Sequence, residues 1–317
     1  MSLTVNQYTN FHGFPKAAEL IEITGAHDLE ASDRAIFNQL LQIAHDSERL
    51  VEPDAEWEIT LASLRKASSK HESNDRVRES LRRLRRTEVK VTYISARTGK
   101  QRVMETHLLE FTDTDIEESK DATVQFGIPK RLRVVLAKSN RWGRIRCEIA
   151  YAMTSKYAIA LYELVCLRQN REQCVEVMSC EQFRDLLGVP PGTYERGLDF
   201  QRKVVDPAVL EVNGLSDMGV NIDLRRRHAR APVYEVAISW WSKSGDEFRA
   251  AVQERNRSKV GRMARLRGEV DKTEALAALP SSGLRAKVQA TVAAMREAGA
   301  PEADIDTFVR GQAEERA

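Results

Sequence analysis

The sequence predicts an α+β fold with two tandem winged-helix domains and a helical C-terminal extension. The first observation is that the order helix, short strand, helix, helix, hairpin, which is the layout of a winged helix, occurs twice along the chain. The second is a change of composition after about residue 243, where aromatic residues nearly vanish and alanine mixes with charges of both signs. We therefore expect four segments, which span residues 1–30, 31–140, 141–242 and 243–317.

The composition fits a protein of about two domains and excludes several classes. Of the 317 residues 42% are hydrophobic, and the formal net charge is only +2, so any basic surface must be local. No apolar run is long enough to cross a membrane, and the N-terminus has no leader-like pattern. No C-x-x-C pair occurs among Cys147, Cys166, Cys174 and Cys180. These features favour a protein of the reducing cytoplasm without a membrane partner.

Motifs of enzyme chemistry are missing from the sequence. The six histidines make no H-x-H pair, which argues against a metal site. The chain also lacks the phosphate loop G-x-x-x-x-G-K-[ST] and the nucleophile turn G-x-S-x-G. We therefore expect no cofactor and no catalytic residue.

Periodicity and turn residues define the elements of the first domain. The first helix is expected to begin at Ser32, a good N-cap, and to run through DRAIFNQLLQIAHDS. Val77, Leu81 and Leu84 stand at i, i+4 and i+7, which predicts an amphipathic helix over RVRESLRRLRR. Gly99 suits the turn of a hairpin between TEVKVTYIS and QRVMETHLLEF. The remaining elements are a strand at EWEIT, a helix at LASLRKASS, a strand at ATVQFGIP and a helix at KRLRVVLAKS.

The second domain repeats this order. It begins with a long helix at SKYAIALYELVCLRQN, a strand at CVEVMS and a helix at CEQFRDLLGV, which Ser179 caps and Pro190–Gly192 ends. A helix over residues 193–213 follows, and Pro207 predicts a kink after Asp206 because proline has no amide hydrogen. The stretch GVNIDLRRRHARAPVYEVAISWW then predicts two strands around a basic tip. In the extension we expect helices at DEFRAAVQERNRSKVGRMARLR and GLRAKVQATVAAMREAG, joined by a loop at LPSSG.

The predicted helix 193–213 has one apolar and one charged half. At about 100° per residue, the apolar half holds Leu198, Phe200, Val204, Val205, Val209 and Val212. The charged half holds Arg196, Asp199, Arg202 and Lys203, all before the predicted kink. This placement is typical of a recognition helix, whose N-terminal residues contact base edges in the major groove. The alternative is a solvated surface on which Asp199 pairs with Arg202 or Lys203.

Two further basic clusters accompany that helix. On the helix around Val77, Glu79 is the only acid inside the run, and the basic residues are Arg76, Arg78, Arg82, Arg83, Arg85 and Arg86. Arginines without matching acids favour contact with phosphates, and a solvated helix face is the alternative. At the tip of the second hairpin stand Arg225, Arg226, Arg227, His228 and Arg230. A wing would place this tip against the DNA backbone or the minor groove.

Three stretches resemble the iteron-binding plasmid replication initiators of bacteria. They are MTSKYAIALYELVCLRQN, SCEQFRDLLGVPPGTYERGLDFQRKVVDPAVLEVN and LSDMGVNIDLRRRHARAPVYEVAIS. The similarity extends from about Ala31 to Trp241, and its most specific parts are Ser155–Tyr157, Leu161–Glu163 and Tyr194–Pro207. The resemblance implies two winged helices, of which the second reads bases and the first contacts the DNA backbone and mediates dimerisation.

The resemblance also implies the partners and the base-reading residues. The partners are double-stranded DNA of the origin iterons and of an operator, the host replication initiator and the replicative helicase. Monomers would bind the iterons and open the origin, and homodimers would repress the promoter. Carried over by position, the base-reading candidates are Arg196, Arg202 and Lys203. The family often has further basic residues at positions 198 and 201 and an apolar ring at position 197, so Leu198, Gln201 and Gly197 imply a different base preference.

Three other functions stay open at this point. One is a transcriptional repressor of the same fold, which binds an inverted repeat as a dimer and does not support replication. Another is a rolling-circle nickase, which typically needs a histidine pair and a nucleophilic tyrosine; this sequence has no such histidine pair. The last is an assembly factor that acts through the extension after Lys243, which a truncation at that residue would test.

Overall fold

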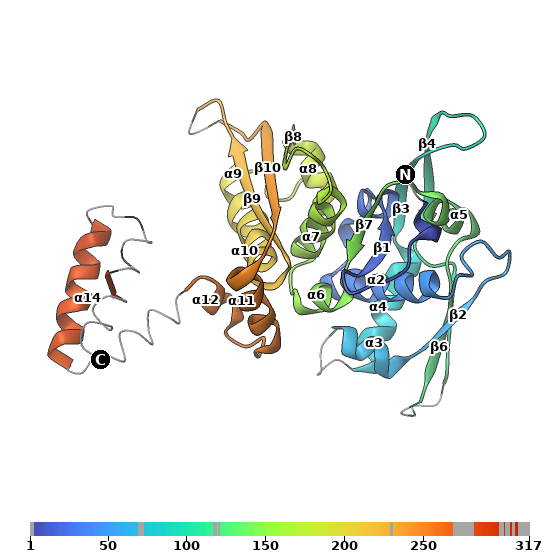
Figure 1. Ribbon diagram of the computed structural model, residues 1–317, viewed down its shortest axis with the longest axis horizontal. Coiled ribbons are helices and arrows are strands. Elements are labelled where there is room, and N and C mark those ends of the chain that lie inside the picture. Colours follow the sequence, from blue (N-terminus) through green and yellow to red (C-terminus); the bar gives the residue numbers. More distant parts are fainter. Residues whose placement is uncertain are drawn as a thin grey trace. The chain divides into compact units, whose positions relative to one another are not determined.

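The computed structural model describes residues 3–68, 73–116, 119, 121–228, 231–268, 282–297, 301, 305 and 308–309. The chain divides into two compact units, residues 1–256 and 257–317. The first unit contains both expected winged-helix domains (Figure 1). Among the helices described, none is long and apolar enough to cross a membrane.

The first domain has the predicted helix–strand–helix–helix–hairpin order. Its elements are α2 (Ala31–Asp46), β2 (Trp57–Thr60), α3 (Leu61–Ser68), α4 (Asn74–Arg86), β3 (Glu88–Ile94) and β4 (Gln101–His107). The prediction that Ser32 caps the first helix is wrong. Glu30 is the N-cap, because its side chain accepts from the N3 amide while the Asp33 carboxylate accepts from the Glu30 amide. Ser73 caps α4 by accepting from the amide of Arg76.

The strand predicted over QRVMETHLLEF is two strands that belong to different sheets. It breaks at Leu108 and Leu109, which are both buried. Before the break β4 pairs with β3 as a two-stranded hairpin. After it, β5 (Phe111–Thr114) and β6 (Thr123–Gly127) join β2 in a three-stranded sheet of order β2-β6-β5. A short helix, α5 (Lys130–Lys138), follows β6, as predicted.

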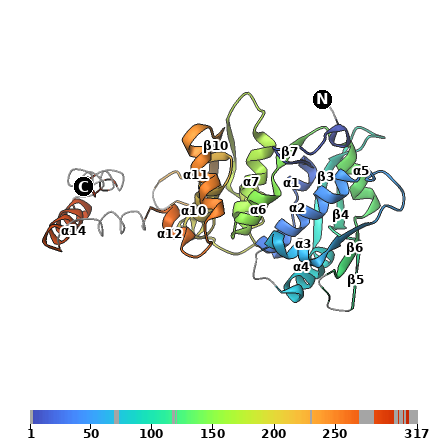
Figure 2. The ribbon, with the colours of Figure 1, turned by 60° about the horizontal axis from the view of Figure 1, so that its bottom comes forward.

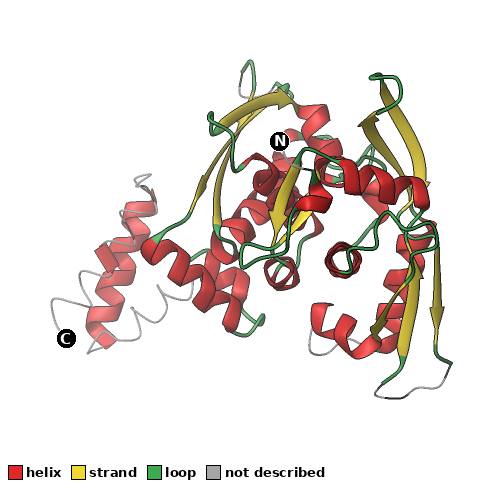
Figure 3. Ribbon diagram, turned by 45° about the vertical axis from the view of Figure 1, so that its right-hand side comes forward, coloured by secondary structure: helices red, strands yellow, loops and turns green. Residues whose placement is uncertain are grey.

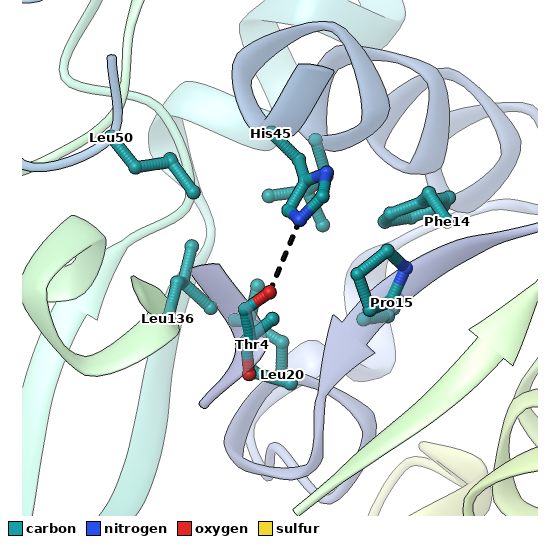
Figure 4. Close-up of a pocket in the computed structure, with 10 residues that line it drawn as sticks. Thr4, Phe14, Pro15, Leu20, His45, Leu50 and Leu136 are labelled. Atoms are coloured by element: carbon teal, nitrogen blue, oxygen red, sulfur yellow. Dashed lines mark hydrogen bonds between the residues drawn. The ribbon is translucent and has the colours of Figure 1, made fainter. Parts of the chain in front are cut away.

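The N-terminal residues, which the sequence left unassigned, are part of the first unit. They form η1 (Thr4–Asn6), β1 (Phe14–Ala17), α1 (Ala18–Ile21) and η2 (Ala26–Asp28). Strand β1 pairs antiparallel with β7 (Trp142–Ile145). Where η1 packs against α2, His45 Nε2 lies 3.3 Å from the carbonyl oxygen of Thr4 beside a small apolar cavity (Figure 4).

Residues 141–242, the predicted second domain, contain a helix that is buried almost all round. After α6 (Cys147–Ala152), the elements are α7 (Lys156–Arg168), β8 (Val175–Ser179), α8 (Cys180–Leu187), β9 (Met218–Arg225) and β10 (Glu235–Ser242). The strands form one antiparallel sheet of order β8-β10-β9. Ser179 caps α8, but the helix ends at Gly188, whose φ of +71° gives the left-handed C-cap, rather than at Pro190.

The helix predicted over residues 193–213 is shorter at its start and contains a wide turn. It consists of α9 (Gly197–Phe200), the π turn η3 (Gln201–Val205) and α10 (Asp206–Leu215). Pro207 has no amide hydrogen to give to the carbonyl of Lys203. The amide of Asp206 bonds instead to the carbonyl of Gln201, five residues back. The distortion therefore precedes Asp206, whereas the prediction placed it after this residue.

Part of the C-terminal extension packs on the second domain. Helix α11 (Gly245–Asn256) lies beside α10 (Figure 2). The Lys243 ammonium donates to the carbonyls of Asn213 and Ser216, and Arg255 donates to the carbonyl of Leu215 over 3.1 Å. These donors satisfy carbonyl groups at the end of α10. A truncation that removes only the second unit thus falls after Asn256 and not at Lys243.

Two helices lie in the described part of the second unit. They are the short α12 (Arg262–Leu266) and the longer α14 (Ser282–Glu297). The single helix predicted over DEFRAAVQERNRSKVGRMARLR is wrong, since α11 and α12 are separate and Gly261, with a φ of +71°, is the N-cap of α12. Most of the loop predicted at LPSSG lies outside the described residues.

A buried polar cluster joins β1, α2 and α7. Lys16 in β1 donates to Asn38 in α2 over 2.8 Å and lies 2.8 Å from Oε1 of Glu163 in α7. Asn38 closes the triangle by donating to the same Glu163 oxygen over 2.7 Å. Burial lowers the pKa of Lys16, and the Glu163 carboxylate opposes that shift. The three side chains therefore satisfy one another where water has no access.

Glu163→Ala should destabilise the first unit by roughly 3–5 kcal/mol, because it leaves the buried Lys16 ammonium without its counter-charge. Urea unfolding followed by tryptophan fluorescence measures this change. Glu110→Ala, at an exposed position of the same chain, is the control and should stay within about 0.5 kcal/mol of the wild type. Equal stabilities of the two variants would contradict a supporting role for the cluster.

Candidate nucleic-acid interface

The segment formed by α9 and η3 exposes Arg202 and Lys203, as the sequence predicted. Arg196 is not inside the helix, because it occupies the N-cap position with an extended ψ of 125°. Leu198, expected on the apolar half, is 52% exposed and is the one clear error in that assignment. Phe200, Val204 and Val205 are buried as predicted. The exposed end of the helix is thus more apolar than its charge pattern suggested.

Lys203 is held in place and Arg202 is not. The Lys203 ammonium lies 3.6 Å from Oδ1 of Asp199 and 5.6 Å from the centroid of the Tyr194 ring. Arg202 forms neither an ion pair nor a side-chain hydrogen bond within the described part of the chain. The alternative pairing foreseen from the sequence, Asp199 with Lys203, is therefore present, but it leaves Arg202 available to a ligand.

A strained turn, which no sequence pattern indicated, precedes this helix. Tyr194 has a φ of +51°, in the left-handed region that a residue with a side chain seldom adopts. Arg184 of α8 holds the turn by donating to the carbonyl of Tyr194 over 3.1 Å and to that of Thr193. Its guanidinium also lies 4.7 Å from the centroid of the Phe200 ring. Arg184 and Tyr194 together set the position from which the helix starts.

The basic tip of the second hairpin is less free than its sequence indicates. Arg225 lies 2.7 Å from Glu235 and 3.3 Å from Asp223, and its pKa is raised, first because of the hydrogen bond to Glu235. Arg226 is half-buried, whereas Arg227 is exposed and has no acidic partner among the described residues. Arg230 lies outside the residues that the structure describes.

On α4, acidic side chains from α2 and from α4 itself pair with several of the arginines predicted to contact phosphates. Arg83 donates to both oxygens of Asp33 over 2.8 and 2.9 Å, and its pKa is raised, first because of this hydrogen bond. Arg82 pairs with Glu79 over 2.7 Å, and that hydrogen bond lowers the pKa of Glu79. Arg78 lies 3.5 Å from Asp75. Across the described ranges, ion pairs and side-chain hydrogen bonds are absent from Arg76, Arg85 and Arg86.

The β3–β4 hairpin adds basic residues that the sequence interpretation left out. Arg97, Lys100 and Arg102 are exposed at or beside its tip. The hairpin layout could have identified them, since a wing was already predicted at Gly99. The β3–β4 and β9–β10 hairpins project to the same side of the first unit (Figures 1 and 3). Their basic residues can therefore face a single ligand.

Metal-binding geometry is absent from the described residues, where no three side chains of the types His, Cys, Asp and Glu come together. What the fold and surface define is a protein with two winged helices that presents arginines on both. That is the class of double winged-helix DNA-binding proteins.

The sequence comparisons identify the family. Residues 15–166 match the model described as "Initiator Replication protein, WH1", and residues 179–240 match "Initiator Rep protein, WH2". The chain belongs to this family of initiator replication proteins, the Rep3 family, which comprises DNA-binding proteins and not enzymes. None of the curated proteins matches the chain in sequence.

Solved structures share the fold at low sequence identity. The structure titled "Crystal structure of Pi initiator protein in complex with iteron DNA" has a TM-score of 0.54 and 11% identity, covering 73% of this chain and 97% of that one. Domains 2 and 3 of RctB match with a TM-score of 0.41 and 14% identity, covering 66% of this chain and 80% of that one. The first match supports two tandem winged helices, as the sequence predicted.

Arg83→Ala should destabilise the protein by roughly 1–3 kcal/mol, because it leaves the buried Asp33 carboxylate with the Glu30 amide as its remaining donor and without a counter-charge. Arg82→Ala, one residue along, should cost under about 1 kcal/mol since its pair with Glu79 is solvated. Thermal unfolding of both variants measures the difference. Similar losses of stability in the two variants would contradict a stabilising role for the contact between Arg83 and Asp33.

Proposed function

We propose that this chain is a plasmid replication initiator that acts in the cytoplasm by binding tandem iteron repeats. The observation that carries the proposal is the pair of hairpins on one side of one compact unit, each next to a helix with exposed arginines. Such a surface suits duplex DNA, a polyanion with a regular repeat. The Pi initiator protein, whose fold the chain shares, was crystallised with iteron DNA, which supports this ligand.

In this proposal the two domains have different tasks. The second domain, residues 141–242, would insert α9 and η3 into a major groove and read bases with Arg196, Arg202 and Lys203, while Asp199 orients Lys203. Arg227 would contact the flanking backbone. The first domain, residues 31–140, would contact phosphates through Arg76 and Arg86. One domain per helical turn requires repeats of roughly 20 base pairs.

Binding would then be coupled to opening of the origin. Distorting the duplex costs an energy that depends on sequence, so flanking A·T-rich DNA would ease the opening. The protein performs no covalent chemistry and would recruit the host initiator and the replicative helicase. Monomers would act at the iterons, and homodimers would repress the gene's own promoter.

Footprinting on the DNA that flanks the gene, at two salt concentrations, tests the proposal. We expect protection of several direct repeats. Protection of one inverted repeat over the promoter alone would instead favour a winged-helix transcriptional repressor. Absence of any specific protection would refute both functions.

Arg202→Ala should weaken binding to the protected repeat by about 1–3 kcal/mol and relax the base preference at one position, because its free guanidinium is placed to read a base. Competition titrations with repeat and unrelated duplexes measure both effects. An equal loss on the two duplexes would show that Arg202 contacts only phosphate.

Arg86→Ala should leave the preferred sequence unchanged and reduce the slope of log K against log salt by about 0.9, the value for one phosphate contact. Binding isotherms at four salt concentrations give this slope. Arg83→Ala is the matched control on the same helix, since its guanidinium is already paired with Asp33 and its slope should equal that of the wild type. An altered sequence preference in Arg86→Ala would contradict the assignment.

A further inference from the structure

Arg226 differs from its two neighbours at the tip of the second hairpin. Arg225 has acidic partners and Arg227 is exposed, but the Nε and Nη2 atoms of Arg226 are covered and have no hydrogen-bond partner among the residues that the structure describes. A covered guanidinium without an acceptor costs free energy. Its position therefore needs an explanation other than the polar contacts of the free protein.

The guanidinium is seated against Gly197, the first residue of α9. A Cβ atom built on Gly197 would lie 3.2 Å from Nη2 and 3.5 Å from Nε of Arg226. The same Cβ would lie 3.0 Å from Cγ2 of Val233, on the opposite side of the hairpin tip. Both ends of the tip thus converge on one glycine, and a Cβ at this position would require their side chains to move by a few tenths of an ångström.

We propose that Arg226 is a positioning residue, seated on Gly197, that fixes the second wing against the start of the recognition helix. This inference rests on the proposed function and refines it, because the sequence alone had assigned Arg226 to DNA contact. While Arg226 contacts Gly197, the wing residue Arg227 keeps a set distance from Arg202 on the helix. The fixed distance selects duplexes whose groove shape lets both residues make contact at once.

Substitutions at both ends of the contact separate positioning from phosphate binding. Arg226→Ala removes the side chain that contacts Gly197, and Arg226→Met replaces it with a long side chain that has no charge. Gly197→Ala tests space alone, since the backbone of Gly197 is outside the left-handed region. The probe is the repeat duplex that the wild-type protein protects, bound at four salt concentrations by full-length protein.

If Arg226 is a positioning residue, Gly197→Ala and Arg226→Ala should each weaken binding about 10-fold, and the double variant should lose no more than either, because the two changes break one contact. Arg226→Met should retain most of the affinity, and the salt slope should stay at the wild-type value. A slope reduced by about 0.9 in both Arg226 variants would overturn the proposal in favour of a phosphate contact.

Arg227→Ala is the matched control, one residue along the same tip. It should reduce the salt slope by about 0.9 and add independently to Gly197→Ala. Urea unfolding without DNA of the wild type, Gly197→Ala, Arg226→Ala and the double variant tests the contact between Arg226 and Gly197 apart from the ligand. Additive effects of Gly197→Ala and Arg226→Ala on unfolding would overturn the proposal, whereas loss of specific binding by the wild type would overturn only the proposed function.

Discussion

The buried triangle of Lys16, Asn38 and Glu163 is the constraint on which the arrangement of the first unit depends. It ties β1, α2 and α7 at a place where an unpaired charge is costly. A second ionic contact, between Arg168 of α7 and Glu22 behind α1, acts across the same boundary. Because both winged helices are anchored to α7, their hairpins share one frame. Two independent domains on a flexible linker would lose translational and rotational freedom relative to each other when both bind DNA. This unit loses less of that freedom, because its domains are already held together.

Pairing within the protein, rather than basicity, distinguishes the arginines of the surface. A guanidinium that already has a carboxylate contributes little net charge to an incoming phosphate, whereas a free one releases counterions when it binds. Asp33 and Glu79 neutralise part of the cluster on α4, Asp199 part of the cluster at Arg196–Lys203 and Glu235 part of the hairpin tip. What remains is a sparse set of free cations on helices and wings. With few free cations, the position of the protein along the DNA matters, since the loss of one phosphate contact removes a large share of the electrostatic binding free energy.

The sequence was sufficient for the fold and insufficient for the details of the interface. Helix and strand periods predicted both winged helices, since Val77, Leu81 and Leu84 are buried as their spacing required. The pairing of β1 with β7 is a long-range contact that local patterns do not encode. The partner of Arg83 lies fifty positions away in the chain, so a count of neighbouring acids missed it. The turn at Tyr194 depends on Arg184 and was likewise beyond local reasoning.

The π turn at Gln201–Val205 has a consequence for how the binding surface can change over generations. A π turn accommodates one residue more than an α turn between the same fixed ends. Loss of one codon within the turn would let it close as an α turn, so that the residues before it and α10 both keep their places. The helix thus has a built-in site at which a deletion, rather than a substitution, can change the side chains that the turn exposes.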